Sequence, residues 1–484
     1  MERQTILHKR QLVRRLPPSS NYCARWVHFP SVDCIPLMSI RFAEISWPTT
    51  RRYWLADARV PACTLGDSAA SLTPPDREGV VSANLLVDDG KIARIGPSGC
   101  KYNDGIPRID LGGRQVWPTL IDIHTHLDKC HSVDRNPNSD GTFHNARLGA
   151  IADRGYWTVP DLRRRMDFSL RCAYAHGVSA IRTHIDTYQE TIERNWQAIR
   201  EMRDEWRGKV DLQAVSLCPI GLLQDEFGDQ VAAMAARSKG LLGGVTRSVV
   251  GDHGTTLDNI DGLLDHFFGL AIRHDLDIDL HVDETHDPTS ATLPYVARAA
   301  LRHGYKRRVV CGHCCSLSNQ PDDLIDRTLD LLAEAEIAIV TLPTVNMYLQ
   351  DRTPGRTPRW RGVTVIQEMR RRGIHVAAAG DNCRDSFFAY GDHDVLDTYR
   401  QAVRIAHLDH PLTDSPAFVS ANPAAIGKFA GHGRIAVGVP ARLIVLNART
   451  INEIVSRPHS DRVVIDRGEV LRAKPPEYSE LWQE

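Results

Sequence analysis

The chain has 484 residues, 42% of them hydrophobic, with a formal net charge of -1 and a pI of about 7.1. This length suits one large barrel-type domain plus a smaller one, and the neutral balance excludes the broad basic surface of a nucleic-acid-binding protein. No stretch approaches the roughly 20 uninterrupted apolar residues of a membrane span.

The first 48 residues differ in texture from the rest of the chain. They are basic, broken by Pro and Ser, and show no hydrophobic periodicity. An arginine-rich, nearly acid-free segment is also typical of a transit peptide. We favour a disordered N-terminal extension over residues 1–48, or a start of translation assigned too early, with Met38 as the true start.

Residues 49–115 predict short strands. YWLADARV and NLLVDDGKIARIG are β-rich runs, and the Asp-Gly pair in the second indicates a hairpin turn. The C-terminal segment 421–484 contains similar runs, GRIAVGVPARLIVLNA and SDRVVIDRGEVLRA. We therefore expect 49–115 and 421–484 to pair into one small β domain built from both chain ends.

Residues 116–420 alternate short apolar strands with longer helical stretches. The strand ending in IDIHTH is followed by strands at 178–186, 210–217, 276–284, 307–313, 337–343 and 374–381, each after a helical segment. Repeated βα alternation predicts a parallel sheet, and about eight units over some 300 residues favour a closed barrel. The predicted fold class is α/β, a (β/α)8 TIM-like barrel carrying the small β domain.

Metal-ligating side chains recur where these strands end. His124 and His126 share one face of their strand because alternate residues of a strand do so, and His281 and Asp381 end two other strands. In a barrel such ends meet at the C-terminal rim, where active sites lie. Three imidazoles and a carboxylate suit one divalent ion, zinc or iron.

The order HTH, LHVDE, GH and GD, with the tail GRIAVGVPARLIVL, resembles the amidohydrolase superfamily over roughly residues 52–450. Within it, HTHLD, IRTHID, DLQAV, TLPTVNMYLQDR and GDN resemble the cytosine deaminase branch. The resemblance implies that His124, His126, His281 and Asp381 bind the metal. It further implies that His313 and Asp381 handle the attacking water and that Glu284 shuttles protons to the ring.

The absence of a lysine at one strand end determines how many metal ions we expect. Two-metal members of the superfamily carry a carboxylated lysine at the fourth strand end, and QAVSLCPIG (213–221), taken as that segment, has none. We therefore expect one ion. Lys129 and His131 are read as rim or supporting residues, and His184 and Asp186 as packing around the ligands.

Departures from cytosine deaminases point to a different ring. The family's Phe-Pro-Gln run is replaced by Leu217-Cys218-Pro219-Ile220, and its second aspartate and its tryptophan by Asn382 and Phe387. Losing the amide changes which ring is accepted, and Phe leaves more room than Trp. We expect Phe387, Asn382 and Gln350 to bind a pterin-type 2-amino-4-oxo ring. Cytosine, isocytosine and an N-alkyl triazine stay open as alternatives.

The expected activity is hydrolytic release of ammonia from a small heterocycle, without nucleic-acid or membrane partners. A catalytically dead scaffold is disfavoured because all four ligands and Glu284 are present. Eleven cysteines, odd in number and scattered, do not form a disulfide framework and indicate a reducing, cytoplasmic setting. We also expect a homo-oligomer, since such barrels often associate.

Overall fold

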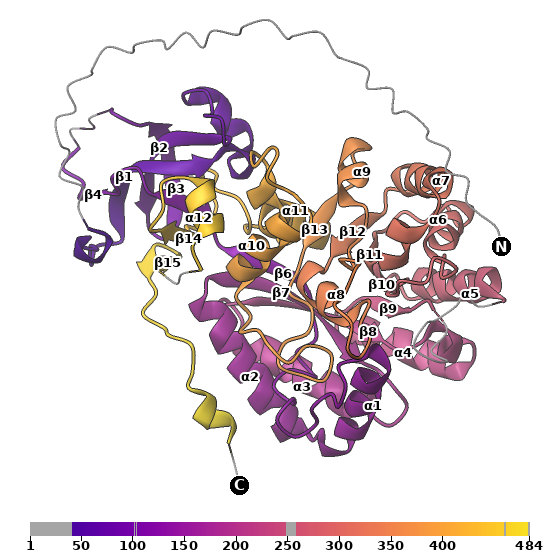
Figure 1. Cartoon of the computed structure of the whole chain (residues 1–484). Coiled ribbons are helices and arrows are strands. Elements are labelled where there is room, and N and C mark those ends of the chain that lie inside the picture. Colours follow the sequence, from indigo (N-terminus) through magenta and orange to yellow (C-terminus); the bar gives the residue numbers. More distant parts are fainter. Residues whose placement is uncertain (1–40, 101, 103, 248–257, 459–460, 483–484) are drawn as a thin grey trace, which may run out of the picture. The chain divides into compact units, whose positions relative to one another are not determined.

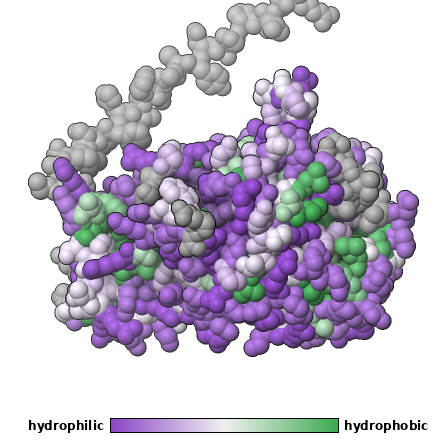
Figure 2. All heavy atoms as spheres, turned by 90° about the horizontal axis from the view of Figure 1, so that it is seen from below, coloured by the Kyte–Doolittle hydropathy of each residue, from purple (hydrophilic) through white to green (hydrophobic). Residues whose placement is uncertain are grey.

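The structure is a computed structural model that describes residues 41–100, 102, 104–247, 258–458 and 461–482 (Figure 1). Residues 41–484 form one compact unit. Residues 1–40 of the predicted N-terminal extension lie outside the described residues. Among the described residues, no helix is both long and apolar enough to cross a membrane. On the face shown in Figure 2, hydrophobic residues form small, separate patches among hydrophilic ones.

Both ends of the chain contribute to one sheet, whose first and last strands lie together in Figure 1. Its strands are β1 (Arg52–Pro61), β2 (Val80–Asp88), β3 (Lys91–Pro97), β4 (Arg108–Asp110), β5 (Gln115–Pro118), β14 (Leu443–Leu446), β15 (Arg462–Asp466) and β16 (Glu469–Val470). The strands β5 and β14 pair antiparallel and so join the two ends. The predicted Asp-Gly turn links β2 to β3, and Asp89 and Gly90 both have positive φ (44° and 77°), as in a type I′ turn.

Eight parallel strands follow in chain order. They are β6 (Leu120–Thr125), β7 (Val178–Asp186), β8 (Asp211–Leu217), β9 (Leu242–Val245), β10 (Ile278–Val282), β11 (Val309–His313), β12 (Ala338–Thr341) and β13 (Val376–Ala378). Regular pairing divides them into a three-stranded sheet, β6 to β8, and a five-stranded sheet, β9 to β13. Isolated parallel bridges join β8 to β9 at Val215–Leu241 and Pro219–Val245, and β6 to the end of β13 at Thr125–Asp381. Regular ladders are thus interrupted at two junctions of the predicted barrel.

Twelve α-helices lie among the described residues, and most of them cover the outside of these strands (Figure 1). They are α1 (Phe143–Asp153), α2 (Val159–Ala175), α3 (Ile192–Glu205), α4 (Glu226–Arg237), α5 (Ile260–Arg273), α6 (Leu293–Arg302), α7 (Asp322–Glu334), α8 (Pro343–Leu349), α9 (Ile366–Arg371), α10 (Val395–Ile405), α11 (Ala421–Gly427) and α12 (Ile451–Ser456). Helix α2 shows the local logic: Thr158 caps its start by accepting a hydrogen bond from the Asp161 N–H. Its Leu162, Met166 and Leu170, at helical spacing, are buried in the core.

One strand was missing from the sequence prediction. The fourth parallel strand is β9, whereas the segment 213–221, taken above as the fourth strand end, contains the third, β8. The true fourth strand leads into Thr246 and Arg247, which also provide no lysine. The reason for expecting a single ion therefore survives the correction of the strand.

Candidate metal centre and active site

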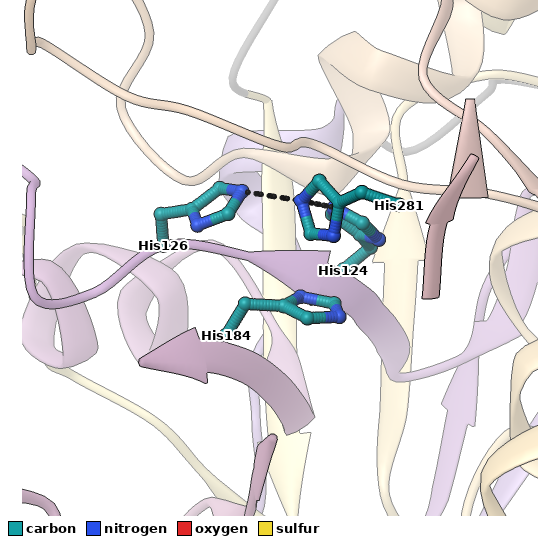
Figure 3. A group of neighbouring side chains, drawn as sticks. All are labelled: His124, His126, His184 and His281. Carbon is teal, nitrogen blue, oxygen red and sulfur yellow. Dashed lines mark hydrogen bonds between the residues drawn. The ribbon is translucent and has the colours of Figure 1, made fainter. Parts of the chain in front are cut away.

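Four histidines from three strands meet at the carboxyl ends of the parallel strands. His124 lies in β6 and His126 directly follows it, while His184 and His281 come from β7 and β10. The Nε2 atoms of His124 and His281 lie 3.2 Å apart, and those of His281 and His126 lie 3.3 Å apart. Figure 3 shows these three rings turned toward one another, with His184 beside them.

Asp381 is brought to the histidines by the junction between β6 and β13. Its N–H donates to the carbonyl of His124 (2.8 Å), and the Thr125 hydroxyl donates to the carbonyl of Asp381 (2.7 Å). Oδ1 of Asp381 lies 3.2 Å from His126 Nε2 and 3.7 Å from His124 Nε2. Asp381 has a φ of +65°, and such left-handed conformations in non-glycine residues concentrate at functional sites.

These residues fit a metal ion. Ligand atoms arranged tetrahedrally at about 2.0–2.1 Å from zinc lie about 3.3 Å from one another, close to the separations above. Both carboxylate oxygens of Asp381 are buried without a hydrogen-bond partner. Burial holds the pKa values of His124, His126 and His281 well below their usual range, followed by the neighbouring imidazoles at His124 and His281 and by the Lys129 ammonium at His126. The rings are therefore neutral, as metal ligands must be.

His184 is a fourth imidazole within reach of the same centre. Its ring centroid lies 4.0 Å from that of His124 and 4.6 Å from that of His281. Its Nε2 also lies 3.4 Å from Oδ1 of Asp279, and the other carboxylate oxygen of Asp279, Oδ2, accepts a hydrogen bond from Arg182 at 2.7 Å. His184 therefore contacts both the Asp279–Arg182 ion pair and the candidate metal ligands, as a packing residue of the centre does.

Glu284 and His313 lie next to the metal-ligand group. Nδ1 of His313 lies 3.5 Å from Oε1 of Glu284 and 4.0 Å from Oδ2 of Asp381. The Asn346 amide bridges the first two, with Nδ2 3.0 Å from His313 Nδ1 and 3.4 Å from Glu284 Oε1. Burial raises the pKa of Glu284 to about 7, so its carboxyl group is able both to give and to take a proton near neutral pH.

A cavity opens above these groups. Its lining includes the candidate ligands His126, His281 and Asp381, the pair Glu284 and His313, and the side chains of Lys129, Phe143, Arg154, Asp186, Tyr188, Arg247, Asn382 and Phe387. Phe387 and Asn382, two of the predicted substrate-binding residues, thus reach it. The third, Gln350, lies in a neighbouring groove, where its amide donates to the carbonyl oxygen of Glu284 at 3.4 Å.

Sequence reasoning missed the cationic side of this cavity. Arg247 lies two residues after the end of β9, is buried, and places its guanidinium 4.1 Å from the ring centroid of Phe143. Arg154 stacks on Tyr188 at 3.7 Å and pairs with Asp186 at 2.8 Å. Had the run LGGV been recognised as a strand, Arg247 would have been predicted at the carboxyl-end rim of the predicted barrel.

Lys129 and His131, expected to be rim or supporting residues, are both buried. Nζ of Lys129 lies 2.6 Å from Oδ1 of Asp186 and 3.4 Å from Nδ1 of His126, which is the supporting position and not an exposed rim. Burial disfavours the charged amine, but Asp128 and Asp186 outweigh this and raise the pKa of Lys129. His131, in the loop that follows β6, is 7% exposed, and its N–H donates to the carbonyl of Cys383 in the loop that follows β13.

Comparison with known proteins identifies relatives of the whole arrangement. The amidohydrolase family model matches residues 162–473. The chain is 44% identical over 442 residues to a pterin deaminase of Rhizobium rhizogenes, covering 91% of this chain and 98% of that protein. It is 26% identical over 295 residues to an N-isopropylammelide isopropyl amidohydrolase of Pseudomonas sp., covering 60% of this chain and 68% of that protein.

Among solved structures, a 5-methylcytosine deaminase of Klebsiella pneumoniae with 5-fluorocytosine bound has a similar fold. The TM-score is 0.73 at 24% identity, over 88% of this chain and 98% of that one. The ligand pattern at the strand ends, the family match and the near full-length similarity lead to one assignment. The chain belongs to the amidohydrolase family.

Proposed function

We propose that this protein is a metal-dependent deaminase that hydrolyses the exocyclic amino group of a pterin-type 2-amino-4-oxo ring. Its main support is the meeting of neutral imidazoles, Asp381 and Glu284 at one cavity in a chain 44% identical to a pterin deaminase. In this proposal His124, His126, His281 and Asp381 hold one divalent ion, zinc or iron. When bound, that ion lowers the pKa of a water molecule and so makes hydroxide available at neutral pH.

The protein side chains move the protons. Asp381, itself one of the proposed ligands, and His313, whose Nδ1 lies 4.0 Å from Oδ2 of Asp381, accept the proton that the attacking water loses. Glu284 protonates the ring nitrogen next to the carbon under attack, which makes that carbon more electrophilic. The exocyclic nitrogen then takes up a proton and leaves as ammonia, and the ring carbon becomes a carbonyl. One water molecule is consumed for each ammonia released.

The cavity walls suit a flat, polar heterocycle. Phe387 packs edge-on against Phe143 (ring centroids 5.6 Å apart), so the two present an aromatic wall above the ligands. Arg247 offers a buried guanidinium beside Glu284, suited to a ring carbonyl such as the 4-oxo group. The Asn382 amide is held by Asp385 at 2.7 Å, which fixes its orientation toward the cavity. Gln350 contributes in this scheme by donating a hydrogen bond to the backbone carbonyl of Glu284 and so helping to position that residue.

Ammonia release from purified, metal-analysed protein tests the proposal. The panel comprises pterin, cytosine, isocytosine and an N-alkyl triazine at equal concentration, with alkylamine measured in parallel. We expect the highest kcat/KM with the pterin. Preferred turnover of cytosine would move the assignment to the cytosine deaminase alternative, and alkylamine release from the triazine would replace deamination by N-dealkylation.

Three further proposals concern the fold, the cellular setting and the oligomeric state. We propose that β6 to β13 close into a (β/α)8 barrel over 116–420, supported by the bridges at both sheet junctions, with 49–115 and 421–484 forming the small β domain. A reducing, cytoplasmic setting is supported by nine described cysteines that are all free, seven of them buried. Light scattering during gel filtration tests the proposed homo-oligomer.

A further inference from the structure

A second group of metal-ligating side chains lies in the loops behind the first. His131 follows β6, whereas Cys383 and His393 belong to the connection between β13 and α10. Each offers one ligand atom, all within 4.8 Å of one another, and the three residues are only 7%, 4% and 7% exposed. We propose that His131, Cys383 and His393 bind a second transition-metal ion of the zinc class, separate from the ion of the deaminase site.

The unsatisfied atoms of this group point to a ligand. Both ring nitrogens of His131 and Nε2 of His393 are buried without a hydrogen-bond partner. A buried polar atom without a partner has lost its hydrogen bonds to water and gained none in return, so native structures rarely keep such atoms. The Cys383 thiol is free and buried. Two imidazoles and a thiolate satisfy a borderline-to-soft ion, and the thiol proton leaves as the metal–sulfur bond forms.

The backbone holds the three side chains in place before any ion arrives. The His131 N–H donates to the carbonyl of Cys383 (3.2 Å), and the Val133 N–H donates to that of Arg384 (3.0 Å). His131 and His393 both have positive φ, +56° and +52°, which costs free energy in non-glycine residues. Gly391 has a φ of +100°, and a Cβ added there would lie 3.2 Å from the Cys383 sulfur, so glycine keeps the sulfur accessible.

A cavity beside Cys383 and His393 leaves room for a fourth ligand. Cys383 and His393 line a cavity of ≈ 380 Å³, together with His176 and Asp392. Asp392 is held by His176, with Oδ2 and Nε2 2.8 Å apart, and Phe168 packs edge-on against the His131 ring at 4.7 Å. Three protein ligands with an open fourth position for water or an anion fit this arrangement.

The position of this group gives the ion a structural role. The loop that carries Cys383 also carries Asp381, Asn382 and Phe387, and the loop that carries His131 also carries His126. An ion bound across the two loops would fix both halves of the deaminase site relative to each other. This second ion takes part in no step of the proposed reaction. The proposal can therefore be tested without knowing the substrate.

Cobalt substitution separates the two sites. The full chain is freed of metal with a chelator and titrated with Co²⁺, followed by absorption and by metal analysis. Thiolate ligation gives an intense charge-transfer band in the near-ultraviolet, and the deaminase site proposed above contains no cysteine. We expect two cobalt ions per chain and the charge-transfer band in the wild type, and the loss of one ion and of the band in Cys383→Ser.

Matched variants make the result decisive. Cys218→Ser removes another buried thiol and is expected to keep the band, as is His126→Asn, which impairs the first site instead. His393→Asn is expected to lower the stoichiometry to one, and it serves as the test where Cys383→Ser fails to give a wild-type circular dichroism spectrum. A wild-type chain that binds one cobalt ion without the band, or a band that persists in Cys383→Ser, overturns the proposal.

Discussion

Gly312→Ala offers a direct test of how tightly the ligand histidines are packed. Gly312 lies on β11, and a Cβ added there would stand 2.8 Å from Cε1 and 3.0 Å from Nδ1 of His124. Carbon atoms in contact stay about 3.5 Å apart, so the ring must move by about 0.7 Å. It has little space to do so, because the His184 and His281 ring centroids lie 4.0 Å and 4.5 Å away. Gly312 does not have a positive φ, so the effect is steric rather than backbone strain.

A shift of this size at a ligand is expected to lower kcat/KM by on the order of 10²-fold. Metal affinity should fall by roughly 10–100-fold, the range seen when ligand orientation is disturbed. The assays are ammonia release from pterin with saturating metal and competition with a chromophoric chelator. Gly155→Ala is the control, since an added Cβ there meets nothing within 4 Å. Wild-type turnover and affinity in Gly312→Ala would refute the packing argument.

Three further substitutions probe the proposed roles. Glu284→Gln keeps the size and the contact with Asn346 but no longer transfers protons, so we expect a kcat loss of about 10²–10⁴-fold, or roughly 2.7–5.4 kcal/mol. Its metal content should equal that of the surface control Glu334→Gln; a lost ion would instead indicate a structural role. Lys129→Met leaves Asp186 with Arg154 alone, which should lower the free energy of unfolding by about 3 kcal/mol in urea titrations. Unchanged stability would show that Arg154 suffices. Arg247→Lys keeps the charge but loses the fork, so KM for pterin should rise about tenfold while kcat changes little; an equal fall in kcat would place Arg247 in the chemical step.

Much of the architecture is readable from periodicity. Strands β7, β8, β10 and β11 are apolar runs after amphipathic helices, and their predicted ranges match the observed ones to within a few residues. The Asp-Gly pair predicted the β2–β3 hairpin because this pair favours the type I′ turn, whose two central residues have the positive φ values observed at Asp89 and Gly90. The H-x-H pattern placed His124 and His126 on one face for an equally local reason.

Strand β9 could not be predicted from periodicity because its residues are determined by contacts with the neighbouring strands. Leu242–Val245 has four residues, two of them glycines, and glycine has low strand propensity. A Cβ at Gly243 would lie 2.4 Å from Val215 Cγ1 and 2.5 Å from the Asp279 carbonyl, and one at Gly244 would lie 2.8 Å from Ile220 Cγ2. The glycines are there so that β8, β9 and β10 can approach closely. That requirement exists only in the folded chain, and Arg247 was missed along with the strand.

The junction between β6 and β13 joins the fold to the chemistry. Here a single bridge, Thr125–Asp381, replaces a regular ladder, and its partners adjoin His124 and include Asp381 itself. An ion held by residues of both strands would add the cross-link that the ladder lacks. At a metal concentration 100 times Kd, binding adds about 2.7 kcal/mol to the state that holds the ion. Amide hydrogen exchange around 120–131 and 376–384 should therefore accelerate by up to about 100-fold when metal is removed. The β2–β3 hairpin, which contacts neither group of ligands, should exchange at the same rate in both states. Equal acceleration in both regions would mean that the ion stabilises the whole chain rather than this junction.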